Sequence, residues 1–465
     1  MNLIIFAGLL GLALAAPALA QPAGPLTYSL TVHPAGPPTP ALKYTLLPEL
    51  KDVTKGNALL RYYKAYSTEW WASINRQPPK WHEAASDAQT APLVKMPADY
   101  AFVKTWKMLN EVDRGARMDH CDWESLEDLK RDGFAYLLPD VQGMRSNAMW
   151  LALRARYELA DGDIDRCIYT LQTGFALSKH VGEGPTLVHM LVGVAISQVM
   201  TRQLDELVQH PKCPNLYWAL ARLPRPYVDL RRPFQAEMMV SATIFPEIDE
   251  LRRGPIPLDQ AQKYLDEFVQ RCKLWGIANL SPQELTVQAL AIYPKAKAAL
   301  VQAGRPQAEV DAMPVPQVLL LHSAEEFFRQ RDELFKWAPL PFPEAYSGMV
   351  KMSREIRAAK ARGDILPPAA DLAPAVEKVM QANMRADRRF AMLRVVEAVR
   401  LYAADHDGRP PAKLADVTDV PIPTDPGTGK PFEYAVKGDH ATITGPDPTG
   451  ETPTLGMVYN VTLKK

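Results

Sequence analysis

Residues 149–180 read MWLALRARYELADGDIDRCIYTLQTGFALSKH, and this stretch decides the fold. Apolar residues recur at helical spacing up to Asp161-Gly162, a pair typical of a helix end. Asp163 then opens a second periodic run, and Pro185 opens a third. Because short turns join antiparallel neighbours, the sequence predicts a packed helical hairpin here, with its first helix over Met144–Leu159.

The same periodicity continues on both sides of this hairpin. It begins near Asn57 and is broken mainly by proline-rich joints, the last of them at Pro339–Pro343. We therefore predict a mainly α fold of packed antiparallel helix pairs, similar to helical repeats, over residues 51–366. The further helices expected are Leu258–Leu274, Ser281–Gly304, Gln317–Lys336 and Pro343–Arg362.

The hairpin itself resembles part of a tetratricopeptide repeat over about thirty residues. The run from Leu159 to Leu177 is similar to the turn and second helix of that repeat. In the resemblance, Cys167 takes the place of the small residue where two helices touch, and Gly174 makes the next close contact. No second copy follows at a period of 34 residues, so the resemblance implies one helical hairpin and not a repeat array.

Residues 373–465 have a different pattern and are predicted to form a separate module. One long amphipathic helix is expected over Ala373–His406, with Arg394, Glu397 and Arg400 on its solvent face. Asp407-Gly408 ends it. Three short strand-like runs follow, which predicts a three-stranded antiparallel sheet; they are Pro431–Val436, His440–Thr444 and Leu455–Leu463.

Part of this module resembles the soluble part of type II secretion pseudopilins. The segments that carry the resemblance are Glu397–Tyr402, Asp405–Pro410, Pro423–Pro426 and Gly429–Tyr434. It covers about 65 residues and implies a shared helix and hairpin. The chain departs from the family at Gly427, where pseudopilins carry tryptophan, and it lacks their N-terminal methylation motif before Met392. The larger helical part is similar to uncharacterised exported bacterial proteins.

The N-terminus has the pattern of a secretory signal. Leu3–Ala16 is almost wholly apolar, and Ala18-Leu19-Ala20 precedes Gln21 as a small-residue cleavage site. We predict a signal peptide over residues 1–20 and an exported protein, periplasmic or extracellular; retention as a short anchor is the alternative. Residues 21–50 carry seven prolines and form a predicted extended lead-in, in which Leu26–Val32 alternates like an edge strand. No later segment is expected to span a membrane.

Charge and cysteine usage narrow the classes of partner and site. The 53 basic and 53 acidic residues balance, so no net field attracts nucleic acid or anionic lipid. After export the four cysteines allow three pairings into two disulfides, with small buried thiols as the alternative. None has the C-x-x-C spacing of a zinc or redox site. The cysteines are Cys121, Cys167, Cys213 and Cys272.

Two clusters carry groups suited to catalysis or metal binding. The run Asp119–Trp123 offers imidazole, thiol and carboxylate ligands for zinc, with a helix cap and core packing as the alternative. His180, Glu183 and His189 flank one loop and would serve acid–base chemistry if that loop faced a cleft. A solvated loop is the plainer interpretation.

Three further features have ordinary structural explanations. Gly427–Lys430 lacks the spacing of a phosphate loop and fits a hairpin turn. Asp405, Asp407 and Asp425 are explained by helix capping and turn formation. Calcium binding by their carboxylates is the alternative. Four tryptophans are explained by packing in the core, and the alternative is that they line a binding groove. They are Trp70, Trp71, Trp81 and Trp106.

The sequence assigns no catalytic, cofactor-binding or metal-binding residue. We therefore predict a non-enzymatic interaction or scaffold protein of the cell envelope that binds protein partners, because packed helical hairpins commonly build protein-binding surfaces. The alternatives are a hydrolase-like envelope enzyme and a component associated with a secretion system. A deep pocket that gathers the two clusters would favour the enzyme, and an apolar groove would favour a protein partner.

Overall fold

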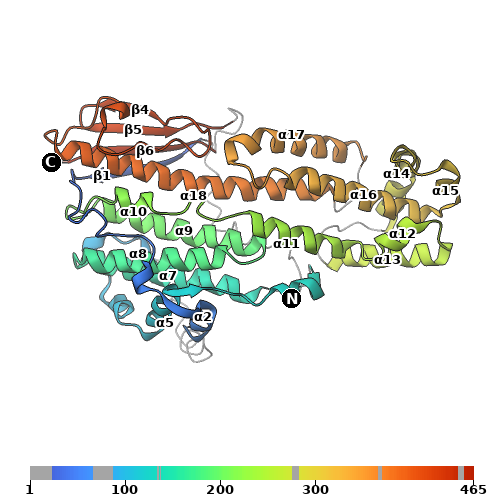
Figure 1. Ribbon diagram of the computed structural model, residues 1–465, viewed down its shortest axis with the longest axis horizontal. Helices are drawn as coiled ribbons and strands as arrows, with labels where there is room; N and C mark the ends of the chain where they lie inside the picture. The colour runs from blue at the N-terminus through green and yellow to red at the C-terminus, as the bar shows by residue number, and fades with distance from the viewer. Residues whose placement is uncertain are drawn as a thin grey trace.

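The computed structural model describes residues 24–65, 87–133, 136, 138–274, 282–364, 369–448 and 455–464. These residues form a mainly helical body with a small sheet at one end, which confirms the predicted fold class (Figure 1). The predicted signal peptide and Trp70, Trp71 and Trp81 lie outside the described residues.

The predicted hairpin forms the centre of the body. It consists of α7 (Pro139–Ala160) and α8 (Ile164–Gly182), and α9 (Leu187–Val208) packs against both. The Asp163 carboxylate accepts from the backbone N–H of Arg166 at 3.1 Å and so caps α8. The Thr186 hydroxyl caps α9 in the same way. The polar residues between the apolar runs therefore set the helix starts.

Two glycines let α8 and α9 approach closely. A Cβ placed on Gly193 of α9 would lie 2.6 Å from the Cα of Gly182 in α8. A Cβ on Gly174 would lie 2.0 Å from the Sδ of Met200. The close approach at Gly193 is therefore between backbones, whereas at Gly174 the Met200 side chain fills the space.

The other helices extend the body in both directions from this centre (Figure 1). Helices α12 to α16 build a second core at the end opposite the sheet. The bounds are α2 (Ala58–Ala65), α5 (Lys107–Ala116), α6 (Leu126–Asp132), α10 (Tyr217–Ala221), α11 (Arg231–Ser241), α12 (Ile248–Arg253), α13 (Leu258–Leu274), α14 (Pro282–Gln302), α15 (Gln307–Ala312), α16 (Val315–Phe335), α17 (Phe342–Ala361) and α18 (Ala369–Ala404), with short 3-10 helices at Leu50–Asp52, Leu93–Lys95, Ala98–Lys104, Ala242–Ile244 and Leu414–Asp416.

The sheet has four strands where three were expected. The three antiparallel strands are confirmed as β4 (Glu433–Lys437), β5 (His440–Gly445) and β6 (Met457–Leu463). The fourth, β1 (Leu26–Val32), comes from the predicted lead-in and pairs parallel with β6. Its last apolar residues, Leu30 and Val32, are buried in the main core, so this segment belongs to the folded body. A separate short pair joins β2 (Thr54–Asn57) and β3 (Met118–His120).

The prediction that one face of α18 is exposed to solvent is wrong. Arg394, Glu397 and Arg400 are all buried. The reason is that α18 lies between the sheet on one side and α9 and α10 on the other (Figure 1). Its charges are tolerated because neighbouring groups pair them, as where Arg400 contacts Glu397 at 2.7 Å and donates to the carbonyl of Cys213.

Two more arginines of α18 connect this helix to the rest of the fold. Arg388 contacts the turn before the sheet, and Arg389 contacts α9 and β1. Arg388 makes a two-point ion pair with Asp425, both contacts at 2.7 Å, and both side chains are fully buried. Arg389 donates to Asp205 of α9 and lies over the ring of Tyr28 in β1. One hydrophobic core accordingly includes residues of α7–α9, α18 and the sheet.

Helix α9 is long and apolar enough to cross a membrane by length and composition, contrary to the sequence expectation. In the structure, 72% of its most apolar window is buried among the other helices. Core helices of folded domains pass the same test, so this finding is weak evidence for a membrane span.

None of the four cysteines forms a disulfide: Cys121 is half-buried and the other three are buried. Burial raises the pKa of the Cys121, Cys213 and Cys272 thiols to about 12, so these thiols are protonated at neutral pH. The structure therefore follows the buried-thiol alternative.

We expect slow alkylation of the native protein by iodoacetamide, because thiolates are the reactive form. After unfolding in urea without reductant, all four cysteines should be modified, as intact-mass measurement would show. Reductant should leave the melting temperature unchanged. If two or four cysteines stayed unmodified in the unfolded protein, disulfides would be present and this account would be contradicted.

Candidate functional site

The two histidines of the predicted acid–base cluster are buried and engaged in the core. The His180 Nδ1 lies 2.7 Å from the Tyr62 hydroxyl, and the His180 carbonyl accepts from the Trp123 indole at 2.9 Å. The His189 Nδ1 lies 2.8 Å from the Thr186 hydroxyl, and its ring packs edge-on to Trp123. Burial lowers the pKa of His180 to about 4 and that of His189 to about 3, so both rings are neutral at pH 7. Trp123 joins the two predicted clusters through packing.

The carboxylates of these clusters and His120 lie at the surface, and Cys121 is half-buried. Glu183 is exposed and pairs with Lys179. Asp119 accepts from the backbone N–H of Gly56 and contacts His120, and both side chains are exposed. The structure therefore does not gather the predicted groups around one cavity. Within the described ranges, no three His, Cys, Asp or Glu side chains are placed to hold a metal ion.

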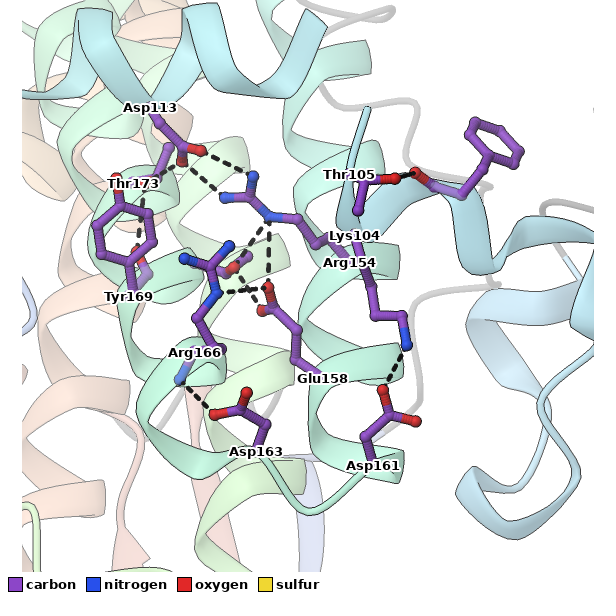
Figure 2. Close-up of polar contacts among 12 residues, drawn as sticks. Lys104, Thr105, Asp113, Arg154, Glu158, Asp161, Asp163, Arg166, Tyr169 and Thr173 are labelled. Atoms are coloured by element: carbon purple, nitrogen blue, oxygen red, sulfur yellow. Dashed lines mark hydrogen bonds and ion pairs between the residues drawn. The ribbon is translucent and has the colours of Figure 1, made fainter. Parts of the chain in front are cut away.

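A buried polar network lies between α5, α7 and α8 (Figure 2). Arg154 donates to both carboxylate oxygens of Asp113, at 2.7 and 2.9 Å, and to the hydroxyl of Thr170. Thr170 in turn donates to Glu158 at 2.5 Å. Burial raises the pKa of Glu158 to about 7. Because the helices enclose this network and its members bind one another, it holds the hairpin together.

The predicted turn at Gly427–Lys430 is built around Asp425. One Asp425 oxygen accepts from Arg388 and from the backbone N–H of Gly427, and the other from Arg388 and the Thr428 hydroxyl. Asp405 and Asp407 are exposed, whereas Asp425 is fully buried. The three carboxylates of the calcium alternative are thus not presented together.

Trp106, the one described member of the predicted aromatic group, packs in the core. It is partly buried and lies edge-on to Trp150 at 5.3 Å between ring centroids. This supports the core interpretation of that residue.

The most suitable binding feature is a cleft of about 630 Å³ over one side of α18. We call it the proline cleft, because seven prolines line it. Three segments form its walls, namely 220–231, 338–343 and the 423–429 turn, and α18 contributes residues between Met380 and Arg394. Its volume falls within the range of about 300–1,000 Å³ typical of ligand sites. None of its residues was nominated as a site from the sequence, apart from Asp425 and Gly429 in the turn.

The floor of the cleft follows helical spacing along α18. Asn383, Asp387, Ala391 and Arg394 recur at intervals of three and four residues and so lie on one face. Met380, Met384 and Phe390 add apolar surface beside them. A rigid helix therefore fixes the polar groups of the floor relative to one another.

Three charged groups in the cleft influence one another. Desolvation raises the pKa of Asp387 to about 7, although the carboxylate accepts from the backbone N–H of Tyr227 at 2.9 Å and lies near Arg225. Desolvation lowers the pKa of Arg225, and the charge of Arg394 lowers it further. Arg225 therefore lies within electrostatic range of both other groups.

Two buried polar atoms of the floor lack partners. The Nε of Arg394 and the Oδ1 of Asn383 make no hydrogen bond within the described part of the chain, and each residue is only 6% exposed. Arg394 donates through Nη2 to the Tyr217 hydroxyl at 2.9 Å, and Asn383 donates to the carbonyl of Val228. An unpaired buried donor or acceptor is costly, so a ligand contact at either atom would be favourable. Both atoms are closed to water in this structure, so each side chain must turn toward the cleft to make that contact.

Comparison with known proteins gave no match. No protein-family model, curated protein or solved structure matches the chain. The candidate site therefore stands on its geometry.

The raised pKa of Asp387 makes a testable prediction about stability. Its folded pKa, about 7, exceeds the ordinary 3.8, so the folded state holds the proton more tightly. This carboxyl therefore stabilises the fold at low pH, and its contribution is lost as pH rises from about 4 to 7. Asp387→Asn should gain stability relative to the natural protein over that window, by at most about 1.4 kcal/mol per pH unit.

Urea denaturation at a series of pH values measures this difference. Asp332→Asn is the control, because the Asp332 side chain is exposed to water. A profile for Asp387→Asn that runs parallel to that of the natural protein would contradict a protonated Asp387.

Proposed function

We propose that the chain is an exported, non-enzymatic interaction protein of the cell envelope that binds its partner in the proline cleft. The observation that carries the proposal is a rigid, largely apolar cleft over α18 that contains buried polar atoms without partners. Such a combination is typical of sites that bind by shape and a few placed polar contacts.

The walls of the cleft favour binding without rearrangement of their backbone. Proline fixes its backbone φ angle, and the 338–343 segment has proline at every second position. A site held in its bound shape loses less conformational entropy when the ligand arrives. The proposed role therefore needs no moving lid.

The composition of the cleft gives little support to the hydrolase alternative. Its lining, as far as the structure describes the chain, contains no Ser, Cys, His, Lys or Tyr. Asp387 is the one group there whose raised pKa suits general acid–base catalysis. The two other carboxyls of the lining, Asp229 and Asp425, are paired with Arg231 and Arg388, and Thr424 is the one hydroxyl among the described lining residues, so we favour a hydrolase less.

The secretion-system alternative has one supporting feature. Helix α18 ends at Ala404, Asp407 and Gly408 follow with positive φ, and a β-hairpin of β4 and β5 comes next, which is the order of elements in the pseudopilin resemblance. The burial of α18 against α9 and α10 distinguishes this chain from a free-standing module. We retain association with a secretion system as the second candidate.

The test compares two exposed leucines in affinity capture from envelope extracts. Leu340 lies in the cleft wall and is 39% exposed, whereas Leu290 lies on α14, outside the cleft, and is 71% exposed. We expect Leu340→Asp to lose the proteins captured by the natural chain and Leu290→Asp to keep them. Equal capture by both variants would refute the cleft as the binding surface.

A further inference from the structure

We propose that the proline cleft binds an extended peptide segment that ends in a free carboxylate, with the carboxylate at Arg225 and Arg394. This inference rests on the proposed function and names the chemistry of the partner. Four observations carry it: the charge of the cleft, its unpaired groups, their spacing and the nature of its walls.

The first observation is an excess of positive charge. Arg231 is paired with Asp229, and Asp425 is paired with Arg388 behind the cleft. Among the lining side chains, this leaves two positive charges, on Arg225 and Arg394, and one carboxyl, that of Asp387. One or two positive charges therefore remain, depending on the protonation of Asp387, and an anionic group would balance them.

The second observation is that both arginines have unused donors. Arg225 has one hydrogen bond within the described chain, from Nη2 to the carbonyl of Ala221 at 3.1 Å. Among the residues that the structure describes, the buried Arg394 donates through Nη2 to Tyr217, and its Nε has no partner. Guanidinium groups bind carboxylates through two parallel hydrogen bonds, so the free donors fit this ligand group.

The third observation is the distance between the polar ends of the floor. Asn383 and Arg394 are eleven residues apart on α18, which corresponds to about 16 Å along the helix axis. An extended peptide of about five residues covers this length. A carboxylate at Arg394 therefore places peptide N–H groups over Asp387 and near the unpaired acceptor of Asn383.

The fourth observation separates a peptide from a fatty acid. An acyl chain would cover Asp387 and Asn383 without offering either a hydrogen bond, which costs free energy. A peptide offers its N–H groups to these acceptors and its apolar side chains to the walls. The seven prolines donate no backbone N–H, which reduces the number of main-chain donors in the walls and leaves the two arginines as the charged donors to the ligand.

The experiment uses the mature full chain and two probes that differ at one group. They are pools of fluorescein-labelled hexapeptides with Gly-Lys followed by four positions of mixed Ala, Val, Leu and Phe, one pool with a free C-terminal carboxylate and one amidated. Fluorescence anisotropy at low salt measures the affinity of each pool. We expect the free-carboxylate pool to bind at least tenfold more tightly.

Variants assign the preference to the two arginines. Arg225→Met removes an exposed side chain and should reduce affinity for the free-carboxylate pool to that of the amidated pool. Arg394→Lys keeps the charge but removes the planar donors, and it should weaken the same pool several-fold. Arg252→Met is the control because Arg252 is an exposed arginine on α12, outside the cleft, and it should bind like the natural chain.

Three results would overturn the inference. They are equal binding of both pools, unchanged binding by Arg225→Met and Arg394→Lys together with a natural melting temperature, and tight binding of dodecanoate with neither pool bound. Equal binding of the pools with loss of protein capture by Leu340→Asp would refute the carboxylate while leaving the proposed function. Equal binding of the pools together with equal protein capture by Leu340→Asp and Leu290→Asp would refute the proposed function as well.

Discussion

Asp425→Ala is expected to lower the free energy of unfolding by about 3–5 kcal/mol, because it leaves the Arg388 charge buried without a partner. Both side chains of this pair are fully buried, and Asp425 also holds the turn through Gly427 and Thr428. Arg388 further donates to the carbonyls of Leu455 and Pro446, so the pair joins α18 to the sheet.

Urea denaturation measures this loss, and two controls isolate its cause. The double variant Arg388→Met with Asp425→Ala removes the stranded charge and should recover part of the stability. Glu325→Ala breaks a two-point arginine pair with Arg252 that is exposed, and it should cost about 1 kcal/mol or less. A loss at Asp425 as small as that at Glu325 would show that the buried pair is not a structural link.

Gly193→Ala is expected to lower the free energy of unfolding by about 3 kcal/mol, because the added methyl group has no room between α8 and α9. The nearest atoms are backbone, namely Cα and N of Gly182 at 2.6 and 2.7 Å and the carbonyl oxygen of Ser178 at 2.8 Å. Backbone cannot move aside without separating the helices.

The matched variant is Gly174→Ala in the same helix pair. There the added methyl group meets the Met200 side chain, which is flexible and can move. We therefore expect a smaller loss at Gly174 than at Gly193. Thermal and urea unfolding give both values, and equal losses would contradict the close backbone contact.

The helices could be predicted from local sequence patterns. The predicted bounds Leu258–Leu274 equal those of α13, and the bounds of the other predicted helices agree to within five residues. Asp163 and Thr186 mark helix starts because their side chains satisfy free backbone N–H groups. Such signals lie within a few residues, so a single sequence displays them.

Long-range pairing could not be predicted in the same way. Leu26–Val32 alternates like a strand, but nothing local names Met457–Leu463 as its partner. The arginines of α18 look solvent-facing in sequence, since charge usually marks the surface. Their burial is tolerated because of partners that the local pattern does not name: Asp425 pairs Arg388, Asp205 pairs Arg389, and Tyr217 accepts from Arg394.

The candidate site was missed for a related reason. Clusters of His, Cys and carboxylate residues are the usual sequence signals of a site, but the structure places His180 and His189 in the core. The proline cleft combines three separate segments with one face of α18. The one available signal was Pro339–Pro343, which we interpreted as a joint between helices, although it also forms a wall.

The central claim is that the partner binds in the proline cleft. Its most direct test is site-specific photo-crosslinking in the cell envelope, with benzoylphenylalanine at Leu340 and, as the control, at Leu290. The account predicts a defined crosslinked protein from position 340, lost in the Arg225→Met background and absent from position 290. Crosslinks of equal yield from both positions, or from position 290 alone, would contradict it.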